Sequence, residues 1–267
     1  MTINTCVIVS FWSGRTARNL HALLEQMMRV DAGATFDLVI VNNGGDQRPL
    51  RLPSKFSPLR YRIINRQNLG YNIGAWECGW RSCEGYTYYL FLQDECFLKR
   101  PGWIFDFEYR MSTDAHIGLL GESIVWDRMT WQFIRQDTDR SFGPNWWGND
   151  RPHPVLFYQQ YIAALGIDRG EVGTHLQSLV LFSSHCVLES INGFPVGATY
   201  DEAVSCEIGI SRLIESKGYR ISKVKDQPFA LIGHRQWTEN YQRRMRFKNI
   251  FRLALRNVMP RRGPDPP

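Results

Sequence analysis

The sequence has 267 residues and a mass of 31.1 kDa, a length that suits one large domain with an enzyme-sized core. Hydrophobic residues make up 43% and charged residues 22%, which excludes a disordered, collagen-like or coiled-coil chain. The net charge is +6, and eight basic residues after residue 240 account for it, since 24 basic and 26 acidic residues remain without them.

The sequence predicts a cytoplasmic protein. Its longest apolar stretches, 6–12 and 86–92, are far shorter than the roughly 20 residues that cross a bilayer. The first five residues lack the basic segment of a secretory signal. The six cysteines form neither a CxxC pair nor a cluster with zinc-ligand spacing, so we expect buried free thiols in a reducing compartment.

The first part of the chain alternates between strand-like and helix-like patterns. Residues 6–12 form a continuous apolar run, typical of a parallel strand that is covered on both faces. In 16–30 the apolar residues recur at helical spacing, and further apolar runs indicate strands at 36–41 and 60–64. This order predicts an α/β fold with a mostly parallel sheet flanked by helices, whose ligands bind at the carboxyl ends of the strands.

The alternation continues through the rest of the expected domain, residues 1–237. Residues 68–80 predict a loop that continues into a helix, and 126–154 show no clear period, so we expect a long loop or lid there. The remaining predicted elements are strands at 87–92, 179–182 and 219–224 and a helix at 205–217.

Two adjacent acids, Asp94 and Glu95, follow the strand predicted at 87–92. Mg²⁺ and Mn²⁺ prefer oxygen ligands, so such a pair can hold one of these ions against a diphosphate. An acidic pair after a strand also occurs in turns and helix caps, and the dipeptide alone favours this second interpretation. The motifs around the pair decide between the two.

Several short motifs follow one another along the chain. They are Val7-Ile-Val-Ser, Val39-Ile-Val-Asn-Asn-Gly, Asn68-Leu-Gly-Tyr-Asn-Ile-Gly, Phe91-Leu-Gln-Asp-Glu, Ile191-Asn-Gly-Phe-Pro and a helix that ends in Gly218-Tyr-Arg-Ile. In this order they resemble the GT-A glycosyltransferases of family 2, over about residues 4–237. The resemblance implies a Rossmann-like GT-A domain that uses a nucleotide sugar as donor.

The resemblance also implies a donor site at the matching positions. The end of the first strand and the turn after the second match the part that cradles the nucleotide base and ribose. The loop at 68–74 matches the part under the base and diphosphate. The implied donor-binding residues are Ser10, Asn42, Asn43, Asn68, Gly70, Gly74 and Asp94.

A divalent metal, Mn²⁺ or Mg²⁺, is the cofactor that the resemblance implies. Gln93, Asp94 and Glu95 stand in the slot of the family's Asp-x-Asp metal motif, with Gln93 in place of the first Asp and Glu95 in place of the second. Glu95 is then the expected metal ligand, with Asp94 beside it. His234 resembles a late histidine that completes the metal or diphosphate site in some of these enzymes, although a lone histidine is often structural.

The family's general base lies eleven residues before the Gly of the Gly-Tyr pair, and this position is Glu207. Cys206 replaces the acid that usually precedes it. An inverting transfer needs one carboxylate to take a proton from the attacking hydroxyl. Asp201 and Glu202 are rival bases or acceptor ligands. Without the resemblance, we would expect Glu207 to be a first-turn helix residue that interacts with the macrodipole.

These implications give an expected function. The protein would move a sugar from a nucleoside diphosphate donor to a hydroxyl of a glycan or lipid-linked acceptor, with inversion, in bacterial surface polysaccharide synthesis. The alternative is a catalytically inactive protein that binds a sugar nucleotide or a glycan, because Gln93 and Cys206 replace acids.

Residues 238–267 predict a basic amphipathic helical tail. Such a helix can lie on an anionic membrane, which would place the enzyme on the inner face of the membrane beside a lipid-linked acceptor. It can equally pack against the domain or a second subunit. Nucleic acid is not an expected partner, since no recognisable nucleic-acid-binding module is present.

Overall fold

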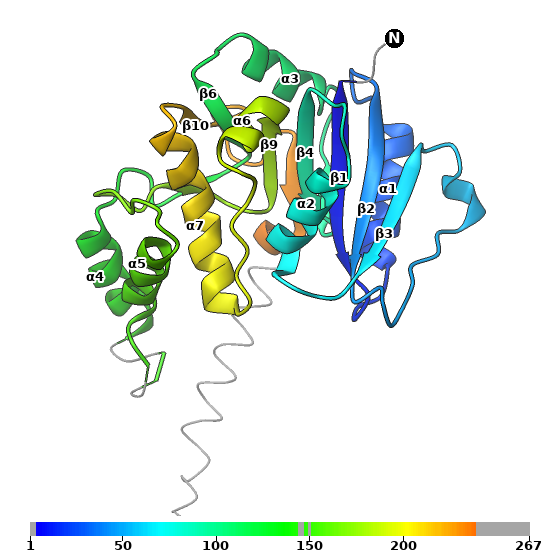
Figure 1. Ribbon diagram of the computed structural model, residues 1–267. Helices are drawn as coiled ribbons and strands as arrows, with labels where there is room; N and C mark the ends of the chain where they lie inside the picture. Colours follow the sequence, from blue (N-terminus) through cyan, green and yellow to red (C-terminus); the bar gives the residue numbers. More distant parts are fainter. Residues whose placement is uncertain (1–3, 144–146, 149–150, 239–267) are drawn as a thin grey trace, which may run out of the picture.

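A seven-stranded sheet runs through the computed structural model, which describes residues 4–143, 147–148 and 151–238. Its order is β10-β6-β9-β4-β1-β2-β3 (Figure 1). Hydrogen-bonded neighbours run parallel except at β9, which is antiparallel to β4 and β6. The strands are β1 (Thr5–Trp12), β2 (Phe36–Asn43), β3 (Tyr61–Arg66), β4 (Tyr88–Gln93), β6 (Ile117–Gly121), β9 (Val180–Ser184) and β10 (Arg220–Lys223). The predicted mostly parallel sheet is confirmed.

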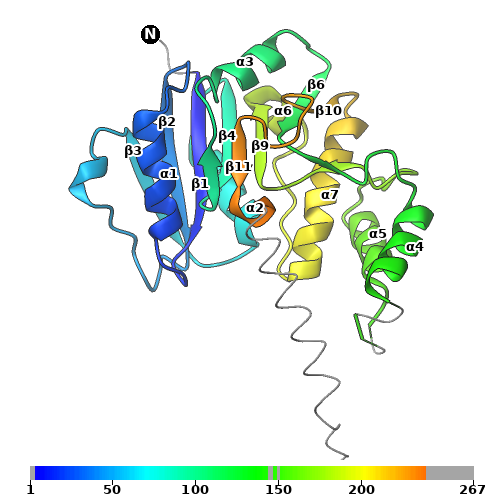
Figure 2. The ribbon, with the colours of Figure 1, turned by 180° about the vertical axis from the view of Figure 1, so that it is seen from behind.

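Helices cover both faces of this sheet (Figures 1 and 2). One face carries α1 (Arg18–Arg29) and α3 (Phe105–Ser112), and the other carries α2 (Tyr71–Arg81), α6 (His185–Ser190) and α7 (Tyr200–Ser216). In β1, Val7 and Val9 point toward the face that α1 and α3 cover, and Cys6 and Ile8 point toward the face that α2, α6 and α7 cover. All four are fully buried, which explains the continuous apolar run of this strand.

Two short two-stranded sheets join segments that are distant in the sequence. β5 (Cys96–Leu98) pairs with β11 (Ile232–His234) in the antiparallel sense, which places His234 opposite Cys96 and next to Glu95. β7 (Ile124–Val125) pairs in the same sense with β8 (His175–Leu176).

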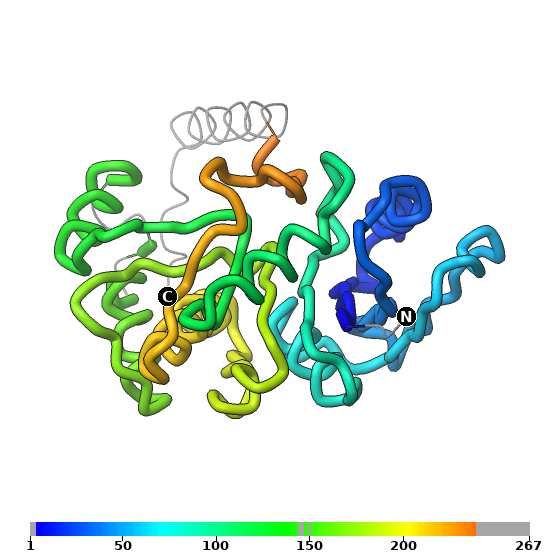
Figure 3. The backbone as a smooth tube through the Cα atoms, turned by 90° about the horizontal axis from the view of Figure 1, so that it is seen from above, coloured from blue at the N-terminus to red at the C-terminus, as the bar shows by residue number. Residues whose placement is uncertain are grey.

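Residues 126–154 are not the long loop or lid that we predicted. They contain α4 (Trp131–Phe142), which begins after Thr130, and α5 (Pro154–Ala164) follows. Both helices share a small apolar core with α7 and lie far from β1–β3 (Figure 3). Along α4 only Trp131 and Ile134 are buried, whereas Phe133 is exposed, so the helical period was too weak to recognise.

α7 begins at Tyr200, five residues before the predicted start at 205. The missed signal is a capping box, in which the Thr199 hydroxyl accepts the N–H of Glu202 and the Glu202 carboxylate accepts the N–H of Thr199. The longer helix places Glu207 in its interior. The first-turn interpretation of Glu207 is therefore wrong.

The expected C-terminal tail lies outside the described residues, apart from Thr238. Within the part of the chain that the structure describes, no helix has both the length and the apolar character needed to span a bilayer. All six cysteines are free, as predicted; four are buried, whereas Cys186 is exposed and Cys78 is partly exposed.

Candidate active site

An open cleft of about 320 Å³ lies at the carboxyl ends of β1, β2 and β4, where the parallel sheet was predicted to bind its ligand. Strand register explains the gathering, because Trp12 pairs with Asn43 and Ser10 pairs with Gln93. The cleft is lined by Ser10, Phe11, Trp12, Arg15, Asn43, Asn68, Tyr71, Asn72, Gln93, Asp94 and Glu95. The structure thus brings together the predicted residues Ser10, Asn43, Asn68, Asp94 and Glu95.

The first turn of α2 forms one wall of this cleft. Tyr71 has a φ of 54°, a left-handed conformation that a large side chain rarely adopts. The buried side chain of Asn43 holds it, since its Nδ2 donates to the Tyr71 carbonyl over 2.7 Å. Tyr71 and Asn72 then line the cleft at the helix N-terminus, whose free N–H groups favour an anion.

Three predicted donor-site residues do not line the cleft. Asn42 points away from Asn43, as neighbours in a strand do, and its Nδ2 donates to Asn65 Oδ1 over 2.9 Å. Gly70 has a φ of 73°, and a β-carbon there would lie 2.1 Å from Val196 Cγ1. A β-carbon at Gly74 would lie 2.2 Å from the Leu69 carbonyl oxygen. Both glycines therefore allow the loop at 68–74 to fold closely beneath the cleft.

The acidic pair shares the cleft with basic groups. Burial and the charge of Glu95 raise the pKa of Asp94 to about 7, although Arg15 and Arg235 act against this shift. Glu95 Oε1 forms an ion pair with Arg15 Nη1 over 3.0 Å. The Glu95 side chain is 28% exposed. Two neighbouring carboxylates in a partly buried position repel each other, so a cation bound here would stabilise the ionised pair.

His234 lies on the other side of Glu95. It is buried, which lowers its pKa to about 4, and its Nε2 is 3.9 Å from Glu95 Oε2 without a hydrogen-bond partner among the described residues. The backbone N–H of Gln236 donates to its Nδ1 over 3.3 Å. The neutral ring then carries its proton on Nε2, where it can donate to a phosphate oxygen. It can bind a metal only if this proton moves to Nδ1.

The acids and histidines of the described residues do not form a group of three that could hold a metal ion alone. Glu95 and Asp94 nevertheless suit a hard cation by their chemistry, and the unpartnered Nε2 of His234 faces the same position. A metal here would need further oxygen ligands, which the phosphates of a donor can supply.

Glu207 is held by donors on both carboxylate oxygens. Oε2 accepts the N–H of Ser178 over 2.7 Å and also the Ser178 hydroxyl, and Oε1 lies 3.4 Å from His175 Nε2. Burial acts to raise the pKa of Glu207, but these hydrogen bonds and the charge of His175 outweigh it, and the pKa is lowered. The side chain stays 20% exposed, so it remains accessible at one point.

The Gly173 carbonyl oxygen determines which ring nitrogen of His175 carries a proton. Its Nδ1 lies 2.7 Å from the Gly173 carbonyl oxygen, which can only accept, so Nδ1 carries a proton. His175 Nε2 can donate to Glu207 only in the imidazolium form. With Oε2 already accepting from two donors, Oε1 is the oxygen of Glu207 that has a lone pair left for a substrate hydroxyl.

Ser178 connects Glu207 to the cleft. Its carbonyl oxygen accepts from Asn72 Nδ2 and from Gln93 Nε2, each over 2.6 Å, while its N–H and hydroxyl donate to Glu207. This explains the glutamine at position 93, because an aspartate there could not donate to a carbonyl. Gln93 thus supports the geometry of the site instead of binding a metal.

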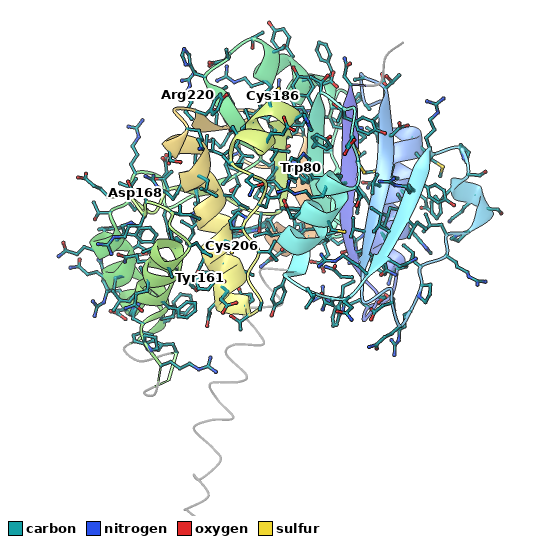
Figure 4. The ribbon with its side chains drawn as sticks, viewed as in Figure 1. Trp80, Tyr161, Asp168, Cys186, Cys206 and Arg220 are labelled. Carbon is teal, nitrogen blue, oxygen red and sulfur yellow. The ribbon has the colours of Figure 1, made fainter. Side chains whose placement is uncertain are left out.

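The other acids of α7 differ in their surroundings. Glu202 belongs to the capping box and accepts the N–H groups of Ala198 and Thr199. The carboxylate of Asp201 makes no hydrogen bond or ion pair within the described residues, and its charge helps to raise the pKa of Tyr158. Cys206, labelled on α7 in Figure 4, is fully buried in the core between the helix and the sheet, which explains why an acid is absent there.

Several residues of this site were not predicted from the sequence. Arg15 follows β1 in a short turn, so its position at the carboxyl edge was a usable signal. His175 begins the two-residue strand β8 and Ser178 follows this strand, and no motif marked either residue. Their roles depend on hydrogen bonds to residues about thirty positions away in the sequence.

Glu122 supports the strand that carries His234. One of its oxygens accepts the N–H groups of Leu231 and Ile232, and the other accepts that of Ala230. We expect Glu122→Ala to lower the free energy of unfolding by about 3 kcal/mol or more, because it leaves buried N–H groups without a hydrogen-bond acceptor. Urea denaturation measures this loss. Glu189→Ala, at an exposed glutamate, is the control and should change stability by less than about 0.5 kcal/mol.

The strand order and the cleft at the carboxyl edge define a GT-A fold, which comparison with solved structures confirms. A mannosyltransferase from Pyrobaculum calidifontis, solved with GDP-Man and Mn²⁺, matches with a TM-score of 0.52 and 13% identity, over 99% of this chain and 66% of its own. The protein therefore has the fold of glycosyltransferases, as the sequence predicted.

Further matches are more distant. S. aureus TarS 1-349 has a TM-score of 0.48 and 13% identity, over 85% of this chain and 59% of its own, and the same fragment in complex with UDP has 0.48 and 15%. The chain thus spans less than two thirds of the length of these proteins. No protein family model and no curated protein matches the sequence.

Proposed function

We propose that the protein is a glycosyltransferase that moves a sugar from a nucleoside diphosphate to a hydroxyl of a glycan or lipid-linked acceptor, with inversion. The observation that carries this proposal is the link through Ser178 between the cleft and an oriented carboxylate, Glu207. The same cleft holds an acidic pair and an arginine, which suit a diphosphate with its counter-ion. Synthesis of a bacterial surface polysaccharide is the proposed setting.

The residues of the site have distinct roles in this reaction. The cleft binds the nucleotide, and Arg15 and the N-terminus of α2 face the negative diphosphate. Glu207 Oε1 accepts the proton of the acceptor hydroxyl while the oxygen of this hydroxyl attacks the anomeric carbon of the sugar. The bond from this carbon to the diphosphate oxygen breaks, and the nucleoside diphosphate leaves with the electron pair. One displacement with one base gives inversion.

A divalent metal is the proposed cofactor, and Glu95 with Asp94 would hold it. When bound, such an ion would neutralise charge on the departing diphosphate. His234 would donate to the diphosphate from Nε2 or complete the metal site from the same atom. The mannosyltransferase with the same fold was solved with Mn²⁺ and a nucleotide sugar, which supports a test with both.

Binding of a nucleotide is the first result that this function requires. We expect UDP, GDP or one of their sugars, with Mn²⁺, to stabilise the protein by about 2.7 kcal/mol at 100 times its dissociation constant. Thermal melting with a panel of these compounds, with and without Mn²⁺, measures it. Release of the nucleoside diphosphate from the sugar nucleotide that binds would support catalysis. Binding without any turnover would favour the inactive alternative, and no binding at all would contradict both.

The basic tail, residues 238–267, is proposed to attach the protein to an anionic membrane. This proposal rests on the sequence of the tail alone. The intact protein should sediment with anionic but not neutral liposomes, more weakly at high salt. A protein truncated after Trp237 should not sediment. Equal binding by the truncated protein would assign the tail to packing or assembly instead.

A further inference from the structure

Two cysteines meet at the edge of the sheet opposite the cleft. Cys6 lies near the start of β1, opposite Tyr89 of β4, and the Tyr89 hydroxyl donates to the carbonyl oxygen of Cys83, which follows the end of α2. Both cysteines belong to the same buried apolar cluster. Cys6 is fully buried, whereas Cys83, 5% exposed, lines a second open cleft of about 370 Å³. None of the catalytic roles proposed above uses either thiol.

Basic and polar groups hold Cys83 in a reactive arrangement. Arg62 Nη2 donates to its sulfur over 2.8 Å and also to the Ser82 carbonyl oxygen, and the Tyr89 hydroxyl donates to the Cys83 carbonyl over 2.6 Å. The neighbouring Cys6 thiol and the charge of Arg62 lower the pKa of Cys83 to about 7, although burial opposes them. The neighbouring Cys83 and burial raise the pKa of Cys6.

The other described cysteines lack this combination. Cys78 is partly exposed on α2, and no arginine contacts its sulfur within the described residues. Cys96 and Cys206 are buried, and burial raises the pKa of both thiols. Cys186 is exposed at the start of α6, far from Cys83 along the chain and on another element (Figure 4). Cys83 alone pairs an activating arginine with a neighbouring thiol among the described residues.

We propose that Cys6 and Cys83 form a peroxide-reactive dithiol that closes to a disulfide. The Cys83 thiolate attacks hydrogen peroxide, the O–O bond breaks, and hydroxide leaves, which gives a sulfenic acid. The Cys6 thiol then loses its proton to the departing hydroxide as its sulfur attacks the Cys83 sulfur, so that the S–O bond of the sulfenic acid breaks and the S–S bond forms. The two thiol protons convert the two hydroxides to water, so one peroxide oxidises two thiols. The disulfide would tie the end of α2 to the start of β1.

The experiment uses the full chain, treated with hydrogen peroxide, alkylated, digested and examined by mass spectrometry. We expect a disulfide-linked pair of peptides with Cys6 and Cys83, with the loss of two hydrogen atoms. Cys83→Ser should abolish the link, and Cys6→Ser should leave Cys83 to accumulate as sulfenic acid. Arg62→Gln should slow the reaction about tenfold. Arg60→Gln, at an arginine that lines the same cleft, should leave the rate unchanged.

Three results would overturn the proposal. The first is oxidation confined to Cys186, with Cys6 and Cys83 still reduced. The second is reaction of the buried Cys96 at the same rate as Cys83. Peroxide reaches Cys96 only when the protein unfolds, so equal rates would mean that Cys83 also reacts only in the unfolded protein. The third is an unchanged rate in Arg62→Gln, which would remove the activation of Cys83 by the arginine. Melting temperatures of the variants distinguish a lost reaction from a lost fold.

Discussion

Glu207→Gln is expected to reduce sugar transfer by roughly 10² to 10⁴-fold while it preserves the fold and the affinity for the donor. The amide oxygen can still accept both donors of Ser178. The amide nitrogen can donate to Nε2 of a neutral His175, so the hydrogen bonds of the site remain satisfied. What the amide cannot do is take a proton from the acceptor. The loss should therefore appear in kcat and leave nucleotide binding, measured by titration, unchanged.

Two neighbouring acids provide the controls for Glu207→Gln. Asp201→Asn changes the acid of α7 whose carboxylate makes no hydrogen bond within the described residues, and it should leave transfer nearly intact. Glu202→Gln weakens the capping box and should lower thermal stability more than activity. A loss of transfer in Asp201→Asn with full activity in Glu207→Gln would move the role of base to Asp201.

The part of the fold that could be predicted from sequence is the part fixed by strong local patterns. The apolar runs of β1, β2 and β4 mark strands buried on both faces, and the rule for parallel sheets then places Ser10 and Asp94 at one edge. The same logic could have separated Asn42 from Asn43, since successive strand residues face opposite sides. The weak period of α4 gave no such signal.

The part of the site that could not be predicted depends on contacts between distant segments. Ser178 receives hydrogen bonds from α2 and β4 and donates to α7, and none of these partners is near it in sequence. His175 acquires its role from the Gly173 carbonyl and the Glu207 carboxylate. In the sequence, Gln93 is only a replacement for the first acid of a metal motif. Its role follows from its hydrogen bond to the Ser178 carbonyl oxygen.

If the cleft holds the proposed divalent ion, its removal is expected to weaken nucleotide binding by roughly a hundredfold, and Glu95→Gln should remove the same enhancement. Burial and the charge of Glu95 raise the pKa of Asp94, and a cation bound beside the acidic pair would oppose both effects. Isothermal titration of UDP and GDP into the intact protein, with Mn²⁺ or with EDTA, measures the enhancement. Glu25→Gln, at an exposed ion pair with Lys55, is the control and should keep it.

The titration in EDTA distinguishes the effect of Glu95 on nucleotide affinity from that of Arg15. Glu95 holds Arg15 in an ion pair, so Glu95→Gln releases an arginine that lines the same cleft. In EDTA the variant should bind nucleotide as well as the wild type or more tightly, although Mn²⁺ no longer helps it. His234→Ala should lower affinity in both conditions if Nε2 donates to a phosphate, and only with Mn²⁺ if Nε2 binds the metal. If EDTA leaves wild-type binding unchanged, Arg15 neutralises the diphosphate and the metal assignment fails.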